Sequence, residues 1–163
     1  MCYSGSARQV QELKSGTEEA TGTTITLDDN NCVAGYESTG AEGYEEIQGI
    51  FGGLVASDLV FGVRYDRPDE SDRYFTSNFD RATRTAIILQ GEVGRRWYQT
   101  GNWFTCGVFG GSPGPYYTLG GLVAHELLGH GSGVLSAGSP ASERQASRVE
   151  NLYHAARGQP RRC

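Results

Sequence analysis

The residues best suited to chemistry lie together in the last third of the chain. His125 and Glu126 are adjacent, and His130 follows within the segment AHELLGHGSG. In the pattern H-E-x-x-H on a helix, the two histidines bind zinc and the glutamate serves as general base. Here the second histidine comes one residue later than in that pattern, so the segment predicts a metal site only if the helix is locally distorted.

The extra residue changes the direction of the second histidine. On a regular helix, residues four apart lie about 40° apart around the axis, whereas residues five apart differ by about 140°. A π-bulge absorbs one extra residue and restores the alignment, and such bulges are frequent at functional sites. Gly129 directly precedes His130, and glycine makes a local backbone distortion cheap. We therefore expect a bulge near Leu128 and Gly129.

A third ligand is expected on a neighbouring element, because catalytic zinc typically takes three protein ligands and a water molecule. A second predicted helix offers Glu143, Glu150 and His154, spaced by seven and four residues. This spacing places all three within about 40° on one helix face. Ala146 and Ser147 complete that face with small side chains, which permit close approach to the first helix.

Of the two glutamates, Glu143 is the preferred ligand. It lies thirteen residues past His130, a separation that fits a short loop and a first helical turn. Glu150 is the alternate ligand, or else a residue that orients a ligand histidine or an arginine.

Two resemblances support this interpretation. The segment HELLGHGSG is similar to the zinc signature of the dipeptidyl peptidase III family, which uses the same six-residue spacing; the match covers about nine residues and implies His125 and His130 as ligands and Glu126 as the catalytic carboxylate. The segment SERQASRVENLYHAARGQPRR resembles the end of the metallopeptidase domains of Rhs-type and other polymorphic bacterial toxins, an effector-type group. The matching residues are Glu143, Ala146, Glu150, Asn151, Gly158, Pro160 and Arg162.

The second resemblance covers roughly the last 45 residues and has two departures. That family usually has the four-residue H-E-x-x-H spacing, and usually an arginine where this chain has His154. The resemblance implies a gluzincin-like zinc metallopeptidase that hydrolyses peptide bonds with metal-activated water. It also implies a protein or peptide substrate, a cognate immunity protein as partner, and a secreted or delivered bacterial effector.

The proposed chemistry assigns roles to further residues. Glu126 would accept the proton of the attacking water and pass it to the leaving amine. A donor is needed for the developing oxyanion, and His154 is preferred for this catalytic role over Tyr153, Tyr116 and Tyr117. By analogy, the strand predicted at residues 84–90 would bind an extended peptide by strand addition.

Two other functions compete with this hypothesis. Gly110, Ser112 and Gly114 form the G-x-S-x-G pattern of serine hydrolases. In those enzymes the residue after the serine supplies a backbone N–H to the oxyanion hole, and here that residue, Pro113, has no N–H. The second competitor is a non-catalytic zinc-binding structural or interaction domain, and the late position of His130 is its best support.

The order of the predicted elements indicates a single α+β domain over residues 1–163, with the motifs in 118–162. The resemblance implies that this domain is zincin-like. We expect an N-terminal helix, a small twisted sheet, a zinc helix and a C-terminal helix that bears the glutamates. The first helix is predicted at 7–14 and ends before Gly16. The second is predicted at 118–130, with Thr118 as its N-cap and Gly131 at its end. The third is predicted at 140–157, with Ser139 as its N-cap, Pro140 at its first position and Gly158 past its end. Strands are predicted at 22–29, 59–66, 84–90 and 102–111, a polar loop at 35–49 and a turn at 110–115.

Composition narrows the function classes further. The net charge of −5 on 163 residues gives no basic patch of the kind that nucleic-acid binders need. No apolar run approaches the roughly 20 residues of a membrane span. The four cysteines, none in a C-x-x-C pair, leave open either free thiols or as many as two disulfides; they are Cys2, Cys32, Cys106 and Cys163.

Overall fold

The computed structural model describes residues 1–66, 76–94, 97–100, 112–135 and 143–162. Its helices are α1 (Ala7–Thr21), α2 (Glu45–Ala56), α4 (Leu119–Val123), the π-helix η1 (Ala124–His130), α5 (Gly131–Leu135) and α6 (Glu143–Ala156). Its strands are β1 (Cys2–Ser4), β2 (Thr23–Leu27), β3 (Val33–Ser38), β4 (Gly62–Tyr65), β5 (Asn78–Asp80), β6 (Thr85–Ile88), β7 (Trp97–Thr100) and β8 (Ser112–Tyr116). The α+β class predicted from the sequence is confirmed.

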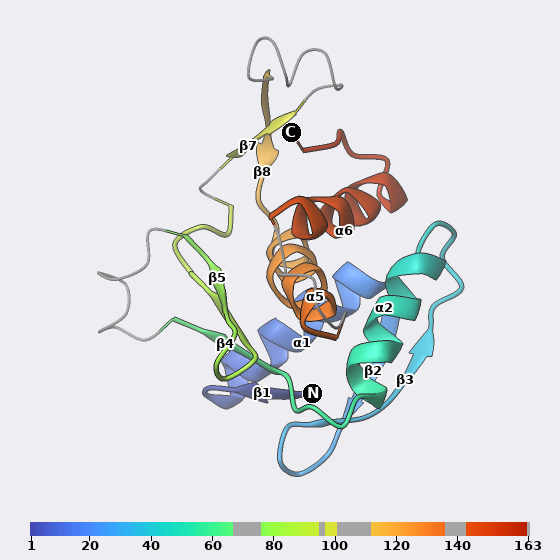
Figure 1. The fold of residues 1–163 in the computed structure, drawn as a ribbon, viewed down its shortest axis with the longest axis vertical. Coiled ribbons are helices and arrows are strands. Elements are labelled where there is room, and N and C mark those ends of the chain that lie inside the picture. The colour runs from blue at the N-terminus through green and yellow to red at the C-terminus, as the bar shows by residue number, and fades with distance from the viewer. Residues whose placement is uncertain (67–75, 95–96, 101–111, 136–142, 163) are drawn as a thin grey trace.

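The largest sheet has the strand order β1-β4-β6-β5. Strands β1, β4 and β6 run parallel, and β5 pairs antiparallel with β6, Phe79 facing Ala86. Strands β2 and β3 form one separate hairpin, and β7 and β8 form a second antiparallel pair. The continuous helical segment α4–η1–α5 lies at the centre of the molecule, with the sheet on one side and α6 crossing above it (Figure 1).

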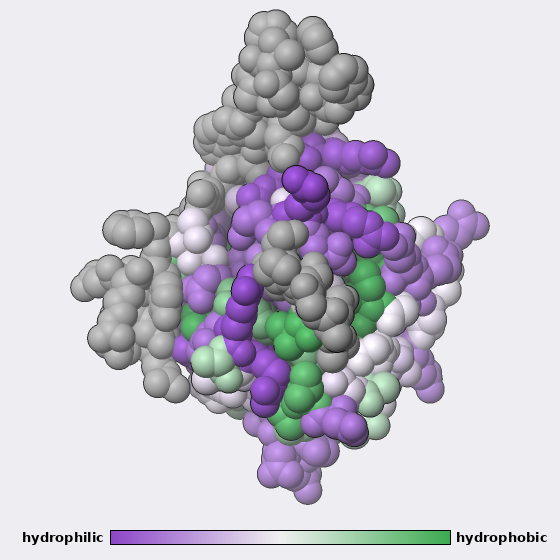
Figure 2. Space-filling model, viewed as in Figure 1, coloured by the Kyte–Doolittle hydropathy of each residue, from purple (hydrophilic) through white to green (hydrophobic). Residues whose placement is uncertain are grey.

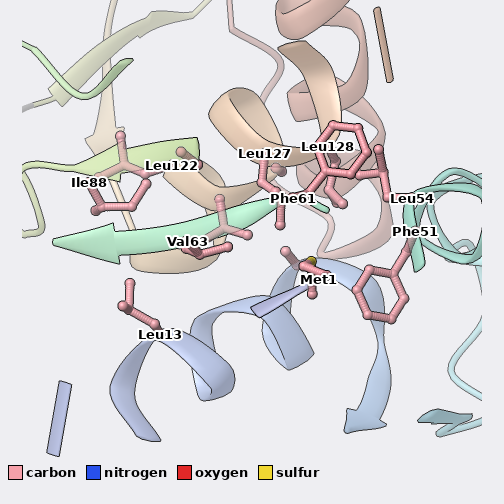
Figure 3. Close-up of a cluster of buried hydrophobic side chains, with 14 of the residues drawn as sticks. Met1, Leu13, Phe51, Leu54, Phe61, Val63, Ile88, Leu122, Leu127 and Leu128 are labelled. Carbon is pink, nitrogen blue, oxygen red and sulfur yellow. The ribbon is translucent and has the colours of Figure 1, made fainter. Parts of the chain in front are cut away.

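The hydrophobic core lies between the sheet and these helices. Leu13 of α1, Val63 of β4 and Leu127 of η1 are fully buried, and Figure 3 shows them converging with side chains of α2. Burying such aliphatic side chains contributes about 1.5–3 kcal/mol each. The core thus packs against η1 and fixes the helix that carries both site histidines.

The first helix is longer than predicted. Ser6 caps it, its side chain accepting from the Gln9 amide, and the helix continues through Gly16 to Thr21. The prediction that Gly16 breaks the helix was therefore wrong. Glycine is needed there for close packing, because a Cβ on Gly16 would lie 2.4 Å from Cγ of Leu119.

The polar loop predicted at 35–49 was also wrong. Strand β3 occupies its first part and α2 begins at Glu45. Most of β3 is exposed, so the strand lacks the alternation of a half-buried one. Helix α2 buries Ile47, Phe51 and Leu54 at helical spacing, and this apolar face begins only after the glutamates at 45 and 46.

The remaining predicted elements fall into three groups. Strands at 22–29, 59–66 and 84–90 are confirmed as β2, β4 and β6. The turn predicted at 110–115 was wrong where β8 begins at Ser112, since antiparallel pairing with β7 extends that segment. The strand predicted at 102–111 lies outside the described residues.

The predicted ends of the two C-terminal helices are partly confirmed. Thr118 caps α4 by accepting from the Gly121 amide, and Gly158, with φ of +63°, follows the end of α6. Gly131 does not stop the first segment, because its backbone is right-handed helical and α5 continues it. Ser139 and Pro140 lie outside the described residues.

A disulfide joins Cys2 to Cys32 across a sequence separation of 30 residues, and so links β1 to the β2–β3 hairpin; Cys106 and Cys163 lie outside the described residues. Hydrophilic side chains dominate the surface around α6 (Figure 2). Within the described part of the chain, no helix has the length and apolar character that crossing a membrane requires.

Candidate metal centre

A π-helical segment places His130 on the same side of the helix as His125. Residues Ala124–His130 form η1, in which the backbone bonds link residues five apart, so side chains at that spacing lie on the same side. His125 and His130 are both buried, and their ring centroids are 5.2 Å apart. The predicted bulge is therefore present, and it extends over the whole interval between the histidines.

Gly129 serves this segment through packing. A Cβ on Gly129 would lie 2.5 Å from Cα of Ala146 and 2.9 Å from its Cβ. Since Ala146 is itself fully buried, η1 and α6 approach each other here backbone to backbone. This contact brings the glutamate-bearing face of α6 against the histidines, as the small residue at 146 suggested.

Glu143 completes a cluster with the two histidines. Its Oε2 lies 3.3 Å from Nε2 of His125, and its Oε1 lies 3.4 Å from Nε2 of His130. The three potential ligand atoms lie within 4.8 Å of one another. Bonds of about 2.0–2.1 Å to a tetrahedral zinc ion separate neighbouring ligand atoms by about 3.3–3.4 Å. The donor types and their closeness therefore suit a bound metal ion, with the carboxylate facing each histidine through a different oxygen.

Glu126 lies beside this cluster without being part of it. Its carboxylate Oε2 is 3.9 Å from Nε2 of His130, and the residue is only 6% exposed. Burial raises the pKa of Glu126 to about 7, against the opposing influence of His125. The structure thus provides a carboxyl group that faces the cluster and exchanges protons near neutral pH.

Glu150 contacts the opposite side of the His125 ring. Nδ1 of His125 donates to Oε2 of Glu150 over 2.8 Å, and Nη1 of Arg162 donates to the same oxygen over 2.7 Å. Burial disfavours the charge of Glu150, but the bonds from His125 and His154 and the charge of Arg162 outweigh it and lower its pKa to about 2. Of the two glutamates, Glu143 faces Nε2 of the histidines and Glu150 orients His125 from behind.

His154 occupies a different place from the one its predicted role requires. It is buried, its Nε2 lies 3.3 Å from Oε1 of Glu150, and its Nδ1 lies 3.0 Å from Oε1 of Gln159. The side chain therefore supports Glu150. His154 lies on the far side of Glu150 from His125, so its position does not suit the predicted role of oxyanion donor. The physical reason is that Glu150 stands between His154 and His125 on the packed face of α6.

The tyrosines proposed as alternatives also differ in position. The hydroxyl of Tyr153 lies 2.6 Å from both Thr118 Oγ1 and Glu19 Oε1, so it joins α6 to α4 and α1. Tyr116 is 57% exposed, whereas Tyr117 is buried and lines the cavity beside the cluster.

Two cavities border the cluster. The first, of about 270 Å³, is lined by Thr76, Ser77, Glu92, Tyr117, Leu122, His125, Glu126, Glu143 and Arg162. The second, of about 380 Å³, is lined by Thr76, Ser77, Asn78, Phe79, Arg81, Glu126, His130 and Glu143. Both cavities share Thr76, Ser77, Glu126 and Glu143, so they adjoin each other and leave the cluster accessible to small molecules or chain segments.

Several of these lining residues carry no signal in the sequence. Ser77, Phe79 and Glu92 come from the region of β5 and β6, and Phe79 stacks over His130 with ring centroids 6.4 Å apart. No spacing pattern marked them, because they reach the site only through the tertiary packing of the sheet edge on η1. Arg162 belongs to the C-terminal motif, which by itself implies no role for it.

The sheet edge near the cluster is β5. Strand β6, to which peptide binding was assigned, pairs with β4 on one side and β5 on the other. Its backbone groups are therefore used within the sheet, and the assignment to residues 84–90 was wrong. In the described part of the sheet, β5 is the terminal strand on this side.

Comparisons with protein-family models, curated proteins and solved structures found no match to this chain.

Proposed function

We propose that this protein is a zinc-dependent metalloprotease, gluzincin-like, with a zincin-like domain. The observation that carries the proposal is the convergence of both histidine Nε2 atoms on the two oxygens of Glu143, at 3.3 and 3.4 Å. Each separation is close to one edge of a tetrahedron around zinc at about 2.0–2.1 Å from each ligand, and the carboxylate faces each histidine with a different oxygen. His125, His130 and Glu143 would hold the ion.

The number of ligands favours a catalytic site over a structural one. Structural zinc sites are usually closed by four protein ligands, whereas catalytic sites keep one position open. In the described residues, three ligand groups converge, and two adjoining cavities border them. This observation weighs against the alternative of a non-catalytic zinc-binding structural or interaction domain.

Zinc supplies Lewis acidity in such a site, activating a water molecule and polarising a substrate carbonyl. Glu126 accepts the proton of the attacking water and returns it to the leaving amine. Its position suits this task, because the carboxylate lies 3.9 Å from Nε2 of His130 and is not one of the three converging ligand groups. The apolar packing of Ala124, Leu127 and Leu128 fixes the helix that carries Glu126.

The substrate is a protein or peptide segment that enters along β5. The residues of β5 border the second cavity, and Phe79 of this strand contacts His130. An extended chain can add to a terminal strand through main-chain hydrogen bonds. With the resemblance of the segment 142–162 to polymorphic-toxin metallopeptidases, this favours a bacterial effector domain with a cognate immunity protein as partner.

The test combines metal analysis with one substitution. Elemental analysis of protein purified without added metal should find one zinc per chain, which chelators remove. Glu126→Gln keeps the shape of the side chain and removes its proton acceptor, so it should retain zinc and lose peptide hydrolysis by at least about 100-fold.

Three outcomes would contradict the proposal. A protein that takes up no zinc has no such site, and a preference for iron would instead indicate the two-histidine, one-carboxylate triad of oxygenases. A Glu126→Gln variant that binds zinc and matches wild type in peptide hydrolysis would leave the metal with a structural role.

A suitable control is Glu37→Gln, because Glu37 is an exposed glutamate on β3, a hairpin strand that lines neither cavity.

A further inference from the structure

The C-terminal segment 157–162 folds back along α6 and reaches the metal centre. Its backbone is fixed at Arg162 by two hydrogen bonds with Asn151: the Arg162 amide donates to Oδ1 over 2.6 Å, and Nδ2 of Asn151 donates to the Arg162 carbonyl over 3.1 Å. Asn151 thus satisfies both backbone polar groups of Arg162. The side chain of Arg162 lines the first cavity.

This segment contacts one oxygen of the Glu150 carboxylate directly and the other through His154. Arg162 donates directly to Oε2, while Gln159 contacts Nδ1 of His154, whose Nε2 lies against Oε1. The Glu150 side chain is completely buried, whereas that of Arg162 is 28% exposed. A carboxylate in such surroundings keeps one orientation only while its partners are in place.

The geometry also fixes where the proton of His125 must reside. An ionised carboxylate offers only lone pairs, so the 2.8 Å contact with Glu150 requires a hydrogen on Nδ1 of His125. Arg162 approaches the same Nδ1 to 3.0 Å, but guanidinium has no acceptor, and both groups therefore donate to Glu150. Nε2 of His125 is left with the lone pair that points towards Glu143.

We propose that Arg162, pinned by Asn151, is a positioning residue of the metal centre: it holds the Glu150 carboxylate in the orientation that keeps His125 in its Nδ1–H tautomer. The inference rests on the proposed metal site, although it concerns a hydrogen-bond chain that exists without the ion. In this chain of contacts, the C-terminal segment acts on Glu150, and Glu150 acts on the ligand.

The experiment measures the ring nitrogens of His125 and the zinc affinity in the same set of variants. The chain has three histidines, so ¹⁵N-histidine labelling gives three resolvable sets of ring signals. The metal-free protein is studied at pH 9, because burial disfavours the charge of His125 but the hydrogen bond and charge of Glu150 outweigh it and raise the pKa of His125 above the ordinary imidazole value of about 6.5. Wild type should show His125 as the Nδ1–H tautomer. Arg162→Met should give a mixture of tautomers and weaken zinc binding about 10-fold.

The sign of the affinity change separates positioning from simple charge. Removing a positive charge near a divalent cation would tighten zinc binding by Coulomb's law, whereas losing the orientation of Glu150 weakens it. The matched control is Arg161→Met, which removes the same side chain from the exposed neighbouring position. It should leave both the His125 tautomer and the zinc affinity as in wild type.

Asn151 provides the second, independent variant. Asn151→Ala should shift both readouts in the same direction as Arg162→Met, and the double variant should be no worse than Arg162→Met alone, because both act through one contact. Circular dichroism should show the same helical content in all of them.

The proposal is overturned if Arg162→Met matches Arg161→Met in both readouts, if it tightens zinc binding, or if the two losses multiply in the double variant. Failure of wild type to bind zinc would count against the proposed function, while the tautomer comparison would still decide the role of Arg162.

Discussion

At the scale of single residues, the two glutamates of α6 contact opposite nitrogens of His125 and should therefore differ in function. Glu143 lies at Nε2 with its side chain 77% exposed, and Glu150 lies at Nδ1 fully buried. Glu143→Ala should abolish tight zinc binding because a ligand is lost, whereas Glu150→Ala should weaken the affinity by about 10–100-fold. Competition with a chromogenic chelator measures both losses.

The same pair should differ in the stability of the metal-free protein. Glu143→Ala removes an exposed side chain and should leave the free energy of unfolding unchanged. Glu150→Ala leaves Arg162 and two histidines without their acceptor and should cost about 3 kcal/mol. Urea denaturation in the presence of a chelator measures this difference. A larger loss of zinc affinity for Glu150→Ala than for Glu143→Ala would transfer the ligand role to Glu150.

The sequence was sufficient to predict that these residues share a site, because the prediction depends only on their spacing along the helices. Helical spacing alone placed Glu143, Glu150 and His154 on one face, and the single-residue delay of His130 alone required a distortion. It could not predict that His154 stands behind Glu150, since the order of side chains across a packed face depends on the depth of packing. The contact of Arg162 with Glu150 was equally hidden, because it depends on the fold-back of the segment after Gly158.

At the scale of elements, the close contact between η1 and α6 determines whether the histidines meet Glu143. We predict that Gly129→Ala forces the two helices apart, because the new Cβ would lie 2.5 Å from the Ala146 backbone. This overpacking should cost about 1–3 kcal/mol in the free energy of unfolding and weaken zinc binding at least about 10-fold, because Glu143 moves with α6.

Gly131→Ala, two residues further along, is the matched control. Its Cβ would meet the nearest atoms of Leu54 at 3.5 Å, an ordinary contact, and its backbone is already helical. It should change stability by less than about 1 kcal/mol and leave zinc affinity unchanged. Thermal unfolding and zinc titration of both variants provide the comparison, and a Gly129→Ala protein with wild-type zinc affinity would show that the close contact is dispensable for the site.

Glycines limited the prediction of elements more than any other residue. Gly16 and Gly131 resemble helix ends in the sequence, yet both lie inside continuous helix, where close neighbours or plain helical geometry explain them. Strand β3 and the start of α2 were hidden because their exposed residues carry no periodic signal. Strand β6 was predictable because Ala86, Ile87 and Ile88 form a short buried apolar run, and β4 because Val63 and Tyr65 alternate with less buried residues.

At the scale of the whole molecule, two cross-links act on separate parts of the fold. The Cys2–Cys32 disulfide ties the three-residue strand β1 to the β2–β3 hairpin, and zinc would tie η1 to α6. Closing a loop of this sequence separation stabilises a protein by about 3–4 kcal/mol in the chain-entropy description. Zinc present at about a thousand times its dissociation constant would add about 4 kcal/mol.

The last prediction is that these two contributions are additive. The double variant Cys2→Ser/Cys32→Ser, which spares Cys106 and Cys163, should lose about 3–4 kcal/mol in the free energy of unfolding and keep the zinc affinity of wild type. Chelation should then destabilise the variant and wild type by equal amounts, because distant sites without shared partners contribute independently. Urea denaturation with and without chelator gives the four required free energies. A chelation effect that differs between the two proteins by more than about 0.5 kcal/mol would show instead that the N-terminal strand and the metal centre are energetically coupled, through the sheet that lies between them.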